Sequence, residues 1–485
     1  MNEQFPHTER PRGRIITLGF GLFISRLAQP FMSFALFAVV ARSLSLEELG
    51  AYVALLSLMT ILQTSASLGL GPLLIREVSL DLSAAGSWLG AAAMIFVPAA
   101  MITWLIFPGC AALLGYKQSA ILGALILGSA LPFACGVQIA ESVFLGQSLV
   151  GAVAWQNLLE NAFRVILSLI VLYSGGRLFS LLTAHAVSRA VGFGLAALFL
   201  RRLPAARPVV FDWPRARVLL SGVPTFGLMT MIGMISIRLD VLVLSVMRSE
   251  GEVGLYGSAY RLLAMAFLLP ESLVGAIFPV LARKLAGSRQ EARTLFKICA
   301  TLLLTIELPL CLTVVALSSW LVPLLFGAKF NGAGPLLSIL IFVLLPHSIN
   351  SMLGYLLQAD HQENAALLIV IASFLTILGL DLTLINRLGM VGAAWGTLIS
   401  TSLLAGLCVI VVNRRVFPLD LLGSTTRLLA AGLVGGVVVS FPPVSDRFYY
   451  SLLPGVACLV TLMLLGGLNK VWLGRVWEVI VQRRD

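Results

Sequence analysis

Five arginines lie inside long apolar stretches of the sequence, surroundings that ordinarily exclude a charged side chain. They are Arg26, Arg164, Arg189, Arg238 and Arg261. A guanidinium group presents its N–H donors as a planar fork that matches the oxygens of a phosphate or a carboxylate. An arginine inside a membrane is costly unless it faces a wet cavity or a partner. Because these five outnumber the acidic residues close to them, they predict a cationic cavity for an anionic substrate.

Polar neighbours favour a cavity position for two of these arginines. Gln29 and Ser33 follow Arg26 at helical spacing, so that a polar stripe runs along one face of its segment. His185 stands one helical turn before Arg189. Two basic groups on one face would repel each other if both were charged, and a site for an anion would tolerate this arrangement.

The other three arginines differ in their acidic neighbours. Glu160 precedes Arg164 by one helical turn, so the spacing is compatible with either a local ion pair or a cavity position. Arg238 and Asp240 point to different sides of a helix and require separate environments. Arg261 has no acidic residue at helical spacing, which favours a cavity position.

Acidic residues inside the apolar stretches are sparse and dispersed. They include Glu160, Asp240, Glu271, Glu307 and Asp381. A buried carboxyl group either neutralises a cation between helices or serves as a proton or sodium site in a transporter. The spacing leaves both roles open for each residue.

Several kinds of chemistry lack their sequence signatures. The sequence contains neither a G-x-x-x-x-G-K-[ST] phosphate loop nor an H-E-x-x-H zinc motif. Its four histidines lack metal-ligand spacing, and its six cysteines are scattered without a C-x-x-C pair. Short outer loops with few charged residues argue against a membrane glycosyltransferase or polymerase. We therefore predict a protein that is not an enzyme, with no cofactor and no metal.

The elements that position these side chains are membrane-spanning helices. Of the 485 residues, 59% are apolar and only 11% charged, whereas soluble domains have about 25% charged residues. Apolar runs long enough to cross a bilayer as helices recur along the whole chain. They predict an all-α polytopic membrane protein of about fourteen transmembrane helices. The expected spans are 17–41, 48–70, 86–108, 119–141, 153–174, 178–200, 219–246, 253–282, 296–324, 335–358, 365–386, 390–412, 427–442 and 450–468.

Basic residues set the orientation of these spans. The formal net charge is +11, and most lysines and arginines outside the spans fall in loops on one side. Because cytoplasmic loops are enriched in lysine and arginine, both termini are expected in the cytoplasm, with the chain in the cytoplasmic (inner) membrane. This topology accounts for the charge without a nucleic-acid partner.

Four pairs of short segments repeat in the same order at a nearly constant offset of about 204 to 214 residues, which indicates an internal duplication. Residues 48–52 match 252–256, residues 72–76 match 279–283, residues 113–117 match 325–329, and residues 131–132 match 345–346. Six expected spans separate the copies, so the repeats have parallel topology. They predict two six-helix lobes followed by an extra C-terminal helix pair.

The expected organisation follows from the spans and the repeat. It consists of a cytoplasmic segment 1–16, an N-lobe 17–200, a basic cytoplasmic linker 201–218, a C-lobe 219–412, extra helices 413–468 and a cytoplasmic tail 469–485. Polar residues between two lobes that rock against each other are typical of alternating-access transport.

The repeat and the arginines make the chain similar to the Wzx-type polysaccharide flippases of the multidrug/oligosaccharidyl-lipid/polysaccharide exporter superfamily. The resemblance covers nearly the whole chain. It is carried by Ser45–Tyr52, Asp240 before Val253–Tyr256, Leu325–Gly327 and Gly389–Ala394. These are loose family patterns and include no catalytic signature.

The resemblance implies a flippase that moves undecaprenyl-diphosphate-linked oligosaccharides to the outer leaflet for O-antigen, capsule or exopolysaccharide assembly. The five arginines would then bind the diphosphate or acidic sugars, and the polymerase and chain-length machinery would be partners. Three alternatives remain: a lipid II flippase, a multidrug antiporter of the same superfamily, and a membrane glycosyltransferase or polymerase. The arginine excess disfavours the antiporter, whose cavity suits cations.

Overall fold

The computed structural model describes residues 12–203, 206–223, 227–360, 362–419, 422–440 and 451–465. For some residues inside helices, above all 12–27, it describes only the backbone. The tail 469–485, most of the segment 1–16 and the side chain of Arg26 therefore lie outside the described residues. The described part of the chain is helical, without β-strands, as predicted.

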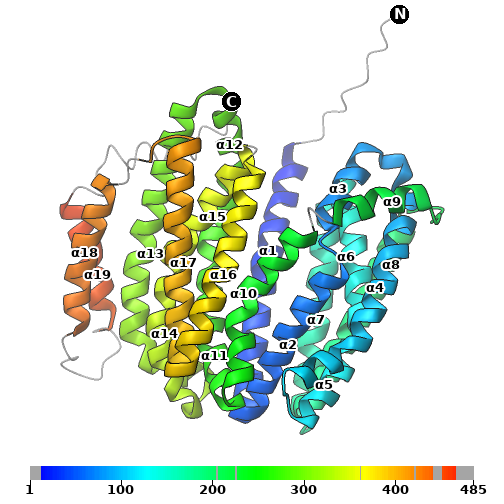
Figure 1. Ribbon diagram of the computed structural model, residues 1–485, viewed down its shortest axis with the longest axis horizontal. Helices are drawn as coiled ribbons and strands as arrows, with labels where there is room; N and C mark the ends of the chain where they lie inside the picture. The colour runs from blue at the N-terminus through cyan, green and yellow to red at the C-terminus, as the bar shows by residue number, and fades with distance from the viewer. Residues whose placement is uncertain are drawn as a thin grey trace, which may run out of the picture. The chain divides into compact units, whose positions relative to one another are not determined.

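Long helices joined by short turns make up the fold (Figure 1). They are α1 (Arg12–Ser43), α2 (Leu46–Ala66), α3 (Gly71–Leu80), α4 (Ala85–Leu113), α5 (Gln118–Gly128), α6 (Leu131–Gly146), α7 (Val150–Tyr173), α8 (Leu178–Arg201), α9 (Trp213–Gly222), α10 (Leu228–Met247), α11 (Glu250–Ala266), α12 (Leu268–Gly287), α13 (Arg289–Phe326), α14 (Gly334–Leu340), α15 (Leu344–Ala359), α16 (Glu363–Leu388), α17 (Met390–Arg415), α18 (Leu422–Ser440) and α19 (Leu453–Leu464).

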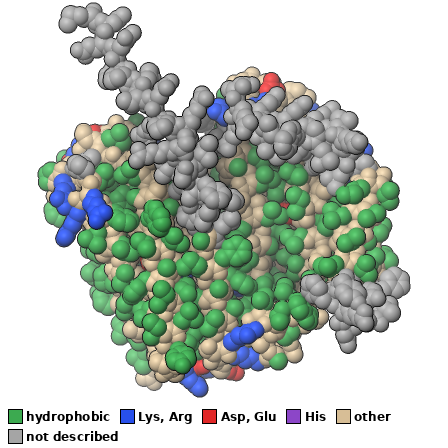
Figure 2. Space-filling model, turned by 180° about the vertical axis from the view of Figure 1, so that it is seen from behind, with side chains coloured by type: hydrophobic (Ala, Val, Ile, Leu, Met, Phe, Trp, Pro, Cys, Tyr) green, Lys and Arg blue, Asp and Glu red, His purple; other side chains and the backbone are tan. Residues whose placement is uncertain are grey.

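Ten helical segments in the described residues are long and apolar enough to cross a membrane. Two further apolar helices, Thr426–Val439 and Leu453–Leu464, are shorter. Figure 2 shows hydrophobic side chains over the middle of one face, with lysines and arginines mainly toward its ends. The chain is a multi-pass membrane protein, and the number of fourteen spans stays a prediction.

Some expected spans consist of two helices in succession. Residues 118–146 form α5 and α6, which are separated next to Pro132, and residues 250–287 form α11 and α12, which are separated shortly before Pro270. Proline lacks the N–H that would continue the helical hydrogen-bond ladder. Helix α9 covers the end of the predicted linker and the start of the predicted span 219–246, so the spanning helix α10 begins only at Leu228.

The chain forms two compact units. Unit 1 contains residues 1–44 and 55–234, and unit 2 contains residues 45–54 and 235–485. Two of the three boundaries fall inside helices, one in α2 and one in α10, and the third lies between α1 and α2. The division into lobes at 17–200 and 219–412 stays a prediction, and each unit is described below by itself.

Unit 1 is organised around two groups of packed helices. Helix α7 packs against α1 and α8, and α4 packs against α5, α6 and α9 (Figure 1). A core of buried apolar side chains, including Trp88 and Phe96 from α4 and Cys135 from α6, joins the second group. Ala216 and Leu219 of α9 belong to the same core.

Unit 2 combines its main helices with a C-terminal pair. Helix α17 packs against α15 and α16, while α18 and α19 pack on each other and against α13 (Figure 1). Leu312, Ala431, Cys458 and Leu462 form the core of the latter contact. Helices α18 and α13 approach each other closely here, since a Cβ atom on Gly435 would lie 2.5 Å from a methyl carbon of Leu312.

Glycines of the two repeat copies make reciprocal contacts within unit 2. A Cβ atom on Gly50 would lie 1.7 Å from the carbonyl oxygen of Glu250, and one on Gly254 would lie 2.5 Å from that of Leu46. In the repeat alignment Gly50 matches Gly254 and Leu46 matches Glu250, so each copy makes the same contact with the other. Such exchange is the signature of a two-fold relation, and small residues allow this close helix approach. The family pattern at these glycines therefore reflects packing.

The turn between α16 and α17 is held by side chains from the α10–α11 region. Gly389 adopts a positive φ of 59°, a conformation that favours glycine. Arg248 donates to the carbonyl oxygen of Ile385 at 2.9 Å, and Glu252 accepts from the amide of Met390 at 3.1 Å. These charges suit the C-terminal and N-terminal helix ends that they meet. The turn thereby fixes the two helices that carry Asp381 and Thr397.

Candidate functional site

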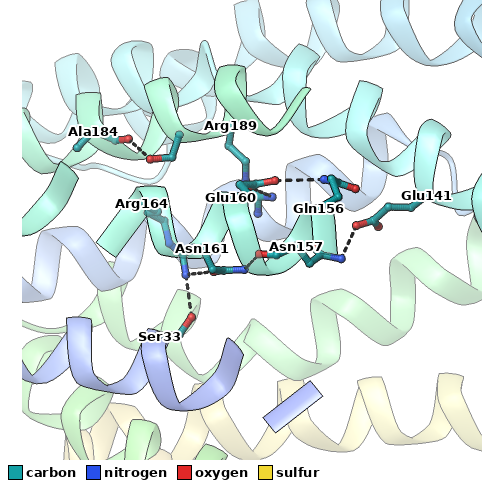
Figure 3. A network of polar contacts seen from close by, with 10 residues as sticks. Ser33, Glu141, Gln156, Asn157, Glu160, Asn161, Arg164, Ala184 and Arg189 are labelled. Carbon is teal, nitrogen blue, oxygen red and sulfur yellow. Dashed lines mark hydrogen bonds and ion pairs between the residues drawn. The ribbon is translucent and has the colours of Figure 1, made fainter. Parts of the chain in front are cut away.

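A polar network lies among the apolar helices of unit 1 (Figure 3). Its side chains come from α1, α6, α7 and α8 and converge on a short stretch of α7. They are Ser33, Glu141, Gln156, Asn157, Glu160, Asn161, Arg164 and Arg189. The network contains Arg164 and Arg189, two of the five arginines that the sequence analysis selected.

Arg189 and Glu160 form an ion pair between α8 and α7. The guanidinium Nη1 donates to Glu160 Oε1 at 2.8 Å, with side chains that are 25% and 5% exposed. Gln156 donates to the other carboxylate oxygen at 3.5 Å. A Cβ atom on Gly192 would lie 2.1 Å from Glu160 Oε2, so the glycine leaves the space that the carboxylate occupies.

Arg164 connects α7 with α1. Its Nη2 donates to Ser33 Oγ at 2.7 Å and to Asn161 Oδ1 at 2.6 Å. Asn161 in turn donates to the carbonyl oxygen of Asn157 at 2.8 Å, which fixes the orientation of its amide. Ser33 belongs to the polar stripe that was predicted after Arg26, so this stripe faces the network at least at Ser33.

Sequence reasoning missed four members of this network, namely Glu141, Gln156, Asn157 and Asn161. Asn157 donates to Glu141 Oε1 at 2.7 Å. The predicted span 119–141 ended at Glu141 and placed it at the membrane edge, whereas α6 continues to Gly146. A test for acidic residues at the last position of each predicted span would have found Glu141. His185, one turn before Arg189 on α8, is buried at 7% exposure.

The remaining two arginines belong to unit 2. Arg238 lies on α10 and Arg261 on α11, and both are half-buried. The Nε atom of Arg238 is buried without a hydrogen-bond partner among the described residues. Because Arg164 and Arg189 belong to unit 1, a single cavity lined by all five arginines stays a prediction.

Asp240 of α10 is held by neighbours on two other helices. Tyr256 of α11 donates its hydroxyl to Asp240 Oδ2 at 2.5 Å, and the amide of Val241 donates to Oδ1 at 2.7 Å. Thr397 of α17 lies 3.4 Å from Oδ2 and 3.1 Å from the tyrosine hydroxyl. The hydrogen bonds to Asp240 thus come from Tyr256, Thr397 and the backbone of α10.

Asp381 of α16 is the contrasting carboxyl group. It is 0% exposed, and neither carboxyl oxygen has a hydrogen-bond partner among the described residues. A Cβ atom on Gly396 would lie 2.5 Å from its Oδ1. Since Gly396 and Thr397 are adjacent on α17, Asp381 and Asp240 approach the same turn of that helix. A buried carboxylate in this position requires a proton or a cation.

Glu271 and Glu307 meet successive polar residues of α15. Glu271 of α12 lies 3.0 Å from His347 Nε2 and accepts from Ser351 at 3.3 Å. Glu307 of α13 accepts from Ser348 at 2.6 Å and is fully buried. Both acids thus join neighbouring helices to α15.

The fold is shared with known transporters. A solved structure of the lipid II flippase MurJ in an inward closed conformation has a TM-score of 0.71 and 15% identity, and the match covers 93% of this chain and 98% of that one. An inward-facing multidrug resistance MATE family transporter of the MOP superfamily has a TM-score of 0.66 and 17% identity, covering 83% and 95%. The chain therefore has the fold of these transporters.

Sequence comparisons identify the family. The Haloferax volcanii protein named "Probable low-salt glycan biosynthesis flippase Agl15" is 24% identical over 387 residues, covering 78% of this chain and 79% of that protein. The family model described as "Polysaccharide biosynthesis protein" matches residues 19–285. This match spans more than half of the chain and includes all five arginines selected from the sequence. The chain belongs to the polysaccharide biosynthesis protein family.

Proposed function

We propose that this protein is a flippase that moves undecaprenyl-diphosphate-linked oligosaccharides across the bacterial inner membrane for polysaccharide assembly. The observation that carries the proposal is the arginine-containing polar network buried among apolar helices of unit 1. The family, the transporter fold and the name of the Haloferax relative support it. We further propose that the termini face the cytoplasm, and that a polymerase and chain-length machinery receive the product.

In this proposal Arg164 is the main diphosphate ligand of unit 1. Two of the hydrogen bonds of its Nη2 go to neutral acceptors, Ser33 and Asn161. A phosphate oxygen that replaces them would gain a charge-assisted hydrogen bond, which is about twice as strong as a neutral one. Arg189 differs because Glu160 already offsets its charge. Arg26, Arg238 and Arg261 complete the proposed cationic cavity, which opens alternately to either side as the lobes rock.

We assign ion coupling to Asp240 and Asp381. Both are buried and approach one turn of α17, and both oxygens of Asp381 lack a partner among the described residues. A proton or a monovalent cation bound there would remove the cost of a buried uncompensated charge. Glu160, Glu271 and Glu307 have partners that join helices, so we assign them structural roles.

Transport by the purified protein in proteoliposomes tests the function. An undecaprenyl-diphosphate-linked oligosaccharide is loaded into the inner leaflet, and its appearance outside is followed with a membrane-impermeant glycosidase. Lipid II and a lipophilic cationic dye are assayed in the same vesicles. We expect transport of the oligosaccharide. Transport of lipid II or of the dye, without the oligosaccharide, would replace the proposal by one of the alternatives.

Substitutions at Arg164 test the site. A hydrogen bond to a charged group contributes about 1.5–3 kcal/mol, so Arg164→Ala should slow oligosaccharide transport at least about tenfold. Arg164→Lys keeps the charge and should retain part of the activity. Arg283→Ala, at an exposed arginine in α12, is the matched control and should transport normally. Normal transport by Arg164→Ala at a normal protein level would refute the assignment.

A further inference from the structure

The segment before α9 exposes large apolar side chains in unit 1. Val209, Val210, Phe211 and Trp213 are 50%, 45%, 72% and 55% exposed. In the described residues they form a nearly continuous run next to the end of α8, with only Asp212 between the last two. Residues 207–222, which contain this run and α9, are here called the strap.

The strap contacts the first turns of an apolar segment that is long enough to span a membrane. A Cβ atom on Gly86 would lie 2.3 Å from the carbonyl oxygen of Pro208, and one on Gly90 would lie 2.1 Å from that of Val210. Both glycines are near the start of the apolar segment Leu82–Leu113. At 1.5 Å per residue, the contacts lie within about 12 Å of Leu82, the first residue of that segment. This distance corresponds to the headgroup and upper acyl region.

The strap is fixed to unit 1 and cannot turn its apolar side chains inward. Ala216 and Leu219 of α9 are buried in the core with Trp88. Arg215 pairs with Asp212 at 2.5 Å and lies over the Trp88 ring at 5.6 Å from its centroid. Helix α9 lies at the ends of α3 and α4, which it contacts (Figure 1). The outer face of the strap is therefore a fixed surface.

Exposed arginines precede and follow this apolar run in the sequence. Arg202, Arg207 and Arg217 are exposed, and their side chains form no hydrogen bond or ion pair in the described part of the chain. Aromatic side chains favour the interface between lipid and water, and basic residues near the surface attract anionic headgroups. The surface thus combines an apolar body at acyl depth with cationic side chains that can reach phosphate.

We propose that the strap is an interfacial binding surface for anionic phospholipids, with Val209, Val210, Phe211 and Trp213 among the acyl chains and Arg202, Arg207 and Arg217 at the phosphates. Charge complementarity selects this occupant over zwitterionic lipids. The strap thereby holds unit 1 at a defined depth in one leaflet. This role is independent of the transported substrate.

Lipid retention by the full-length protein tests the proposal. The protein is reconstituted in vesicles of equimolar phosphatidylglycerol and phosphatidylcholine and extracted in mild detergent, and the two retained lipids are quantified per protein. The variant carries R202Q, R207Q and R217Q together. The control carries R283Q, K297Q and R414Q and loses the same charge at exposed positions outside the strap.

The wild-type protein and the control should retain an excess of phosphatidylglycerol, and the strap variant should lower the phosphatidylglycerol-to-phosphatidylcholine ratio at least about threefold. An unchanged ratio in the strap variant, or an equal fall in the control, would overturn the proposal. Inorganic phosphate added to the wild-type protein is a further test. If it lowered the lipid ratio to that of the strap variant, the proposal would also be overturned, because the surface would then bind phosphate without its lipid. R215Q, at an arginine that already has partners in the protein, should change the ratio little.

Discussion

Glu160 in unit 1 and Asp381 in unit 2 are both buried acids, yet their surroundings are opposite. Glu160 receives hydrogen bonds from Arg189 and Gln156, whereas Asp381 has no hydrogen-bond partner among the described residues. A paired carboxylate fixes its cation in one position, and its loss leaves a buried charge uncompensated. An unpaired carboxyl group remains available for a partner that comes and goes. The comparison separates a structural acid from a candidate coupling acid.

The largest expected effect is the loss of the unit 1 ion pair. Glu160→Gln leaves Arg189 without its counter-charge, and removing one partner of a buried pair costs about 3–5 kcal/mol. Since Arg189 is 25% exposed, we expect a loss at the lower end, near 3 kcal/mol. It is measured as a fall in unfolding temperature of the purified protein in detergent.

The double variant Glu160→Gln/Arg189→Gln sharpens this result. Because it removes both charges, it should recover most of the lost stability. If the double variant were as unstable as Glu160→Gln alone, the pair would not be the source of the effect, and Glu160 would have another role.

The second prediction concerns Asp381 and expects a gain in stability on ion binding, whereas the first expects a loss. A cation that binds only the folded protein stabilises it by about 2.7 kcal/mol at 100 times its Kd. We therefore expect Na⁺ or a fall in pH to raise the unfolding temperature of the wild-type protein, and Asp381→Asn to abolish the response without lowering basal stability. Glu307→Gln, at another buried acid of unit 2, should keep the response. Its persistence in Asp381→Asn would exclude coupling at this site.

The contrast between these acids shows what the sequence could and could not reveal. Long apolar runs predicted the helical membrane fold, because a bilayer leaves few alternatives. The intramembrane charges were also visible as residue types. Their partners were not, because Arg189 reaches Glu160 from the next helix, and because the space around Asp381 depends on Gly396 of α17. A local pattern such as Glu160 before Arg164 shows only neighbours on the same helix.

A third prediction tests how Asp240 differs from Asp381. Tyr256→Phe removes the hydroxyl that donates to Asp240 Oδ2, and the loss of a hydrogen bond to a charged group costs about 1.5–3 kcal/mol. We expect about 2 kcal/mol in thermal unfolding. Tyr260→Phe is the matched control, since Tyr260 lies beside Tyr256 with ring centroids 6.0 Å apart. Equal losses in the two variants would assign the effect to general packing.

The smallest expected effect concerns the link between α1 and α7. Ser33→Ala removes one neutral acceptor of Arg164, and such a bond contributes about 1 kcal/mol. Because Asn161 still accepts from the same nitrogen, thermal unfolding should shift slightly while the guanidinium becomes more available to an anionic substrate. Ser43→Ala, at a serine of α1 that bonds only within its helix in the described residues, should change neither property. A large fall in transport with Ser33→Ala would mean that the serine contacts the substrate itself, which would extend the site from α7 onto α1.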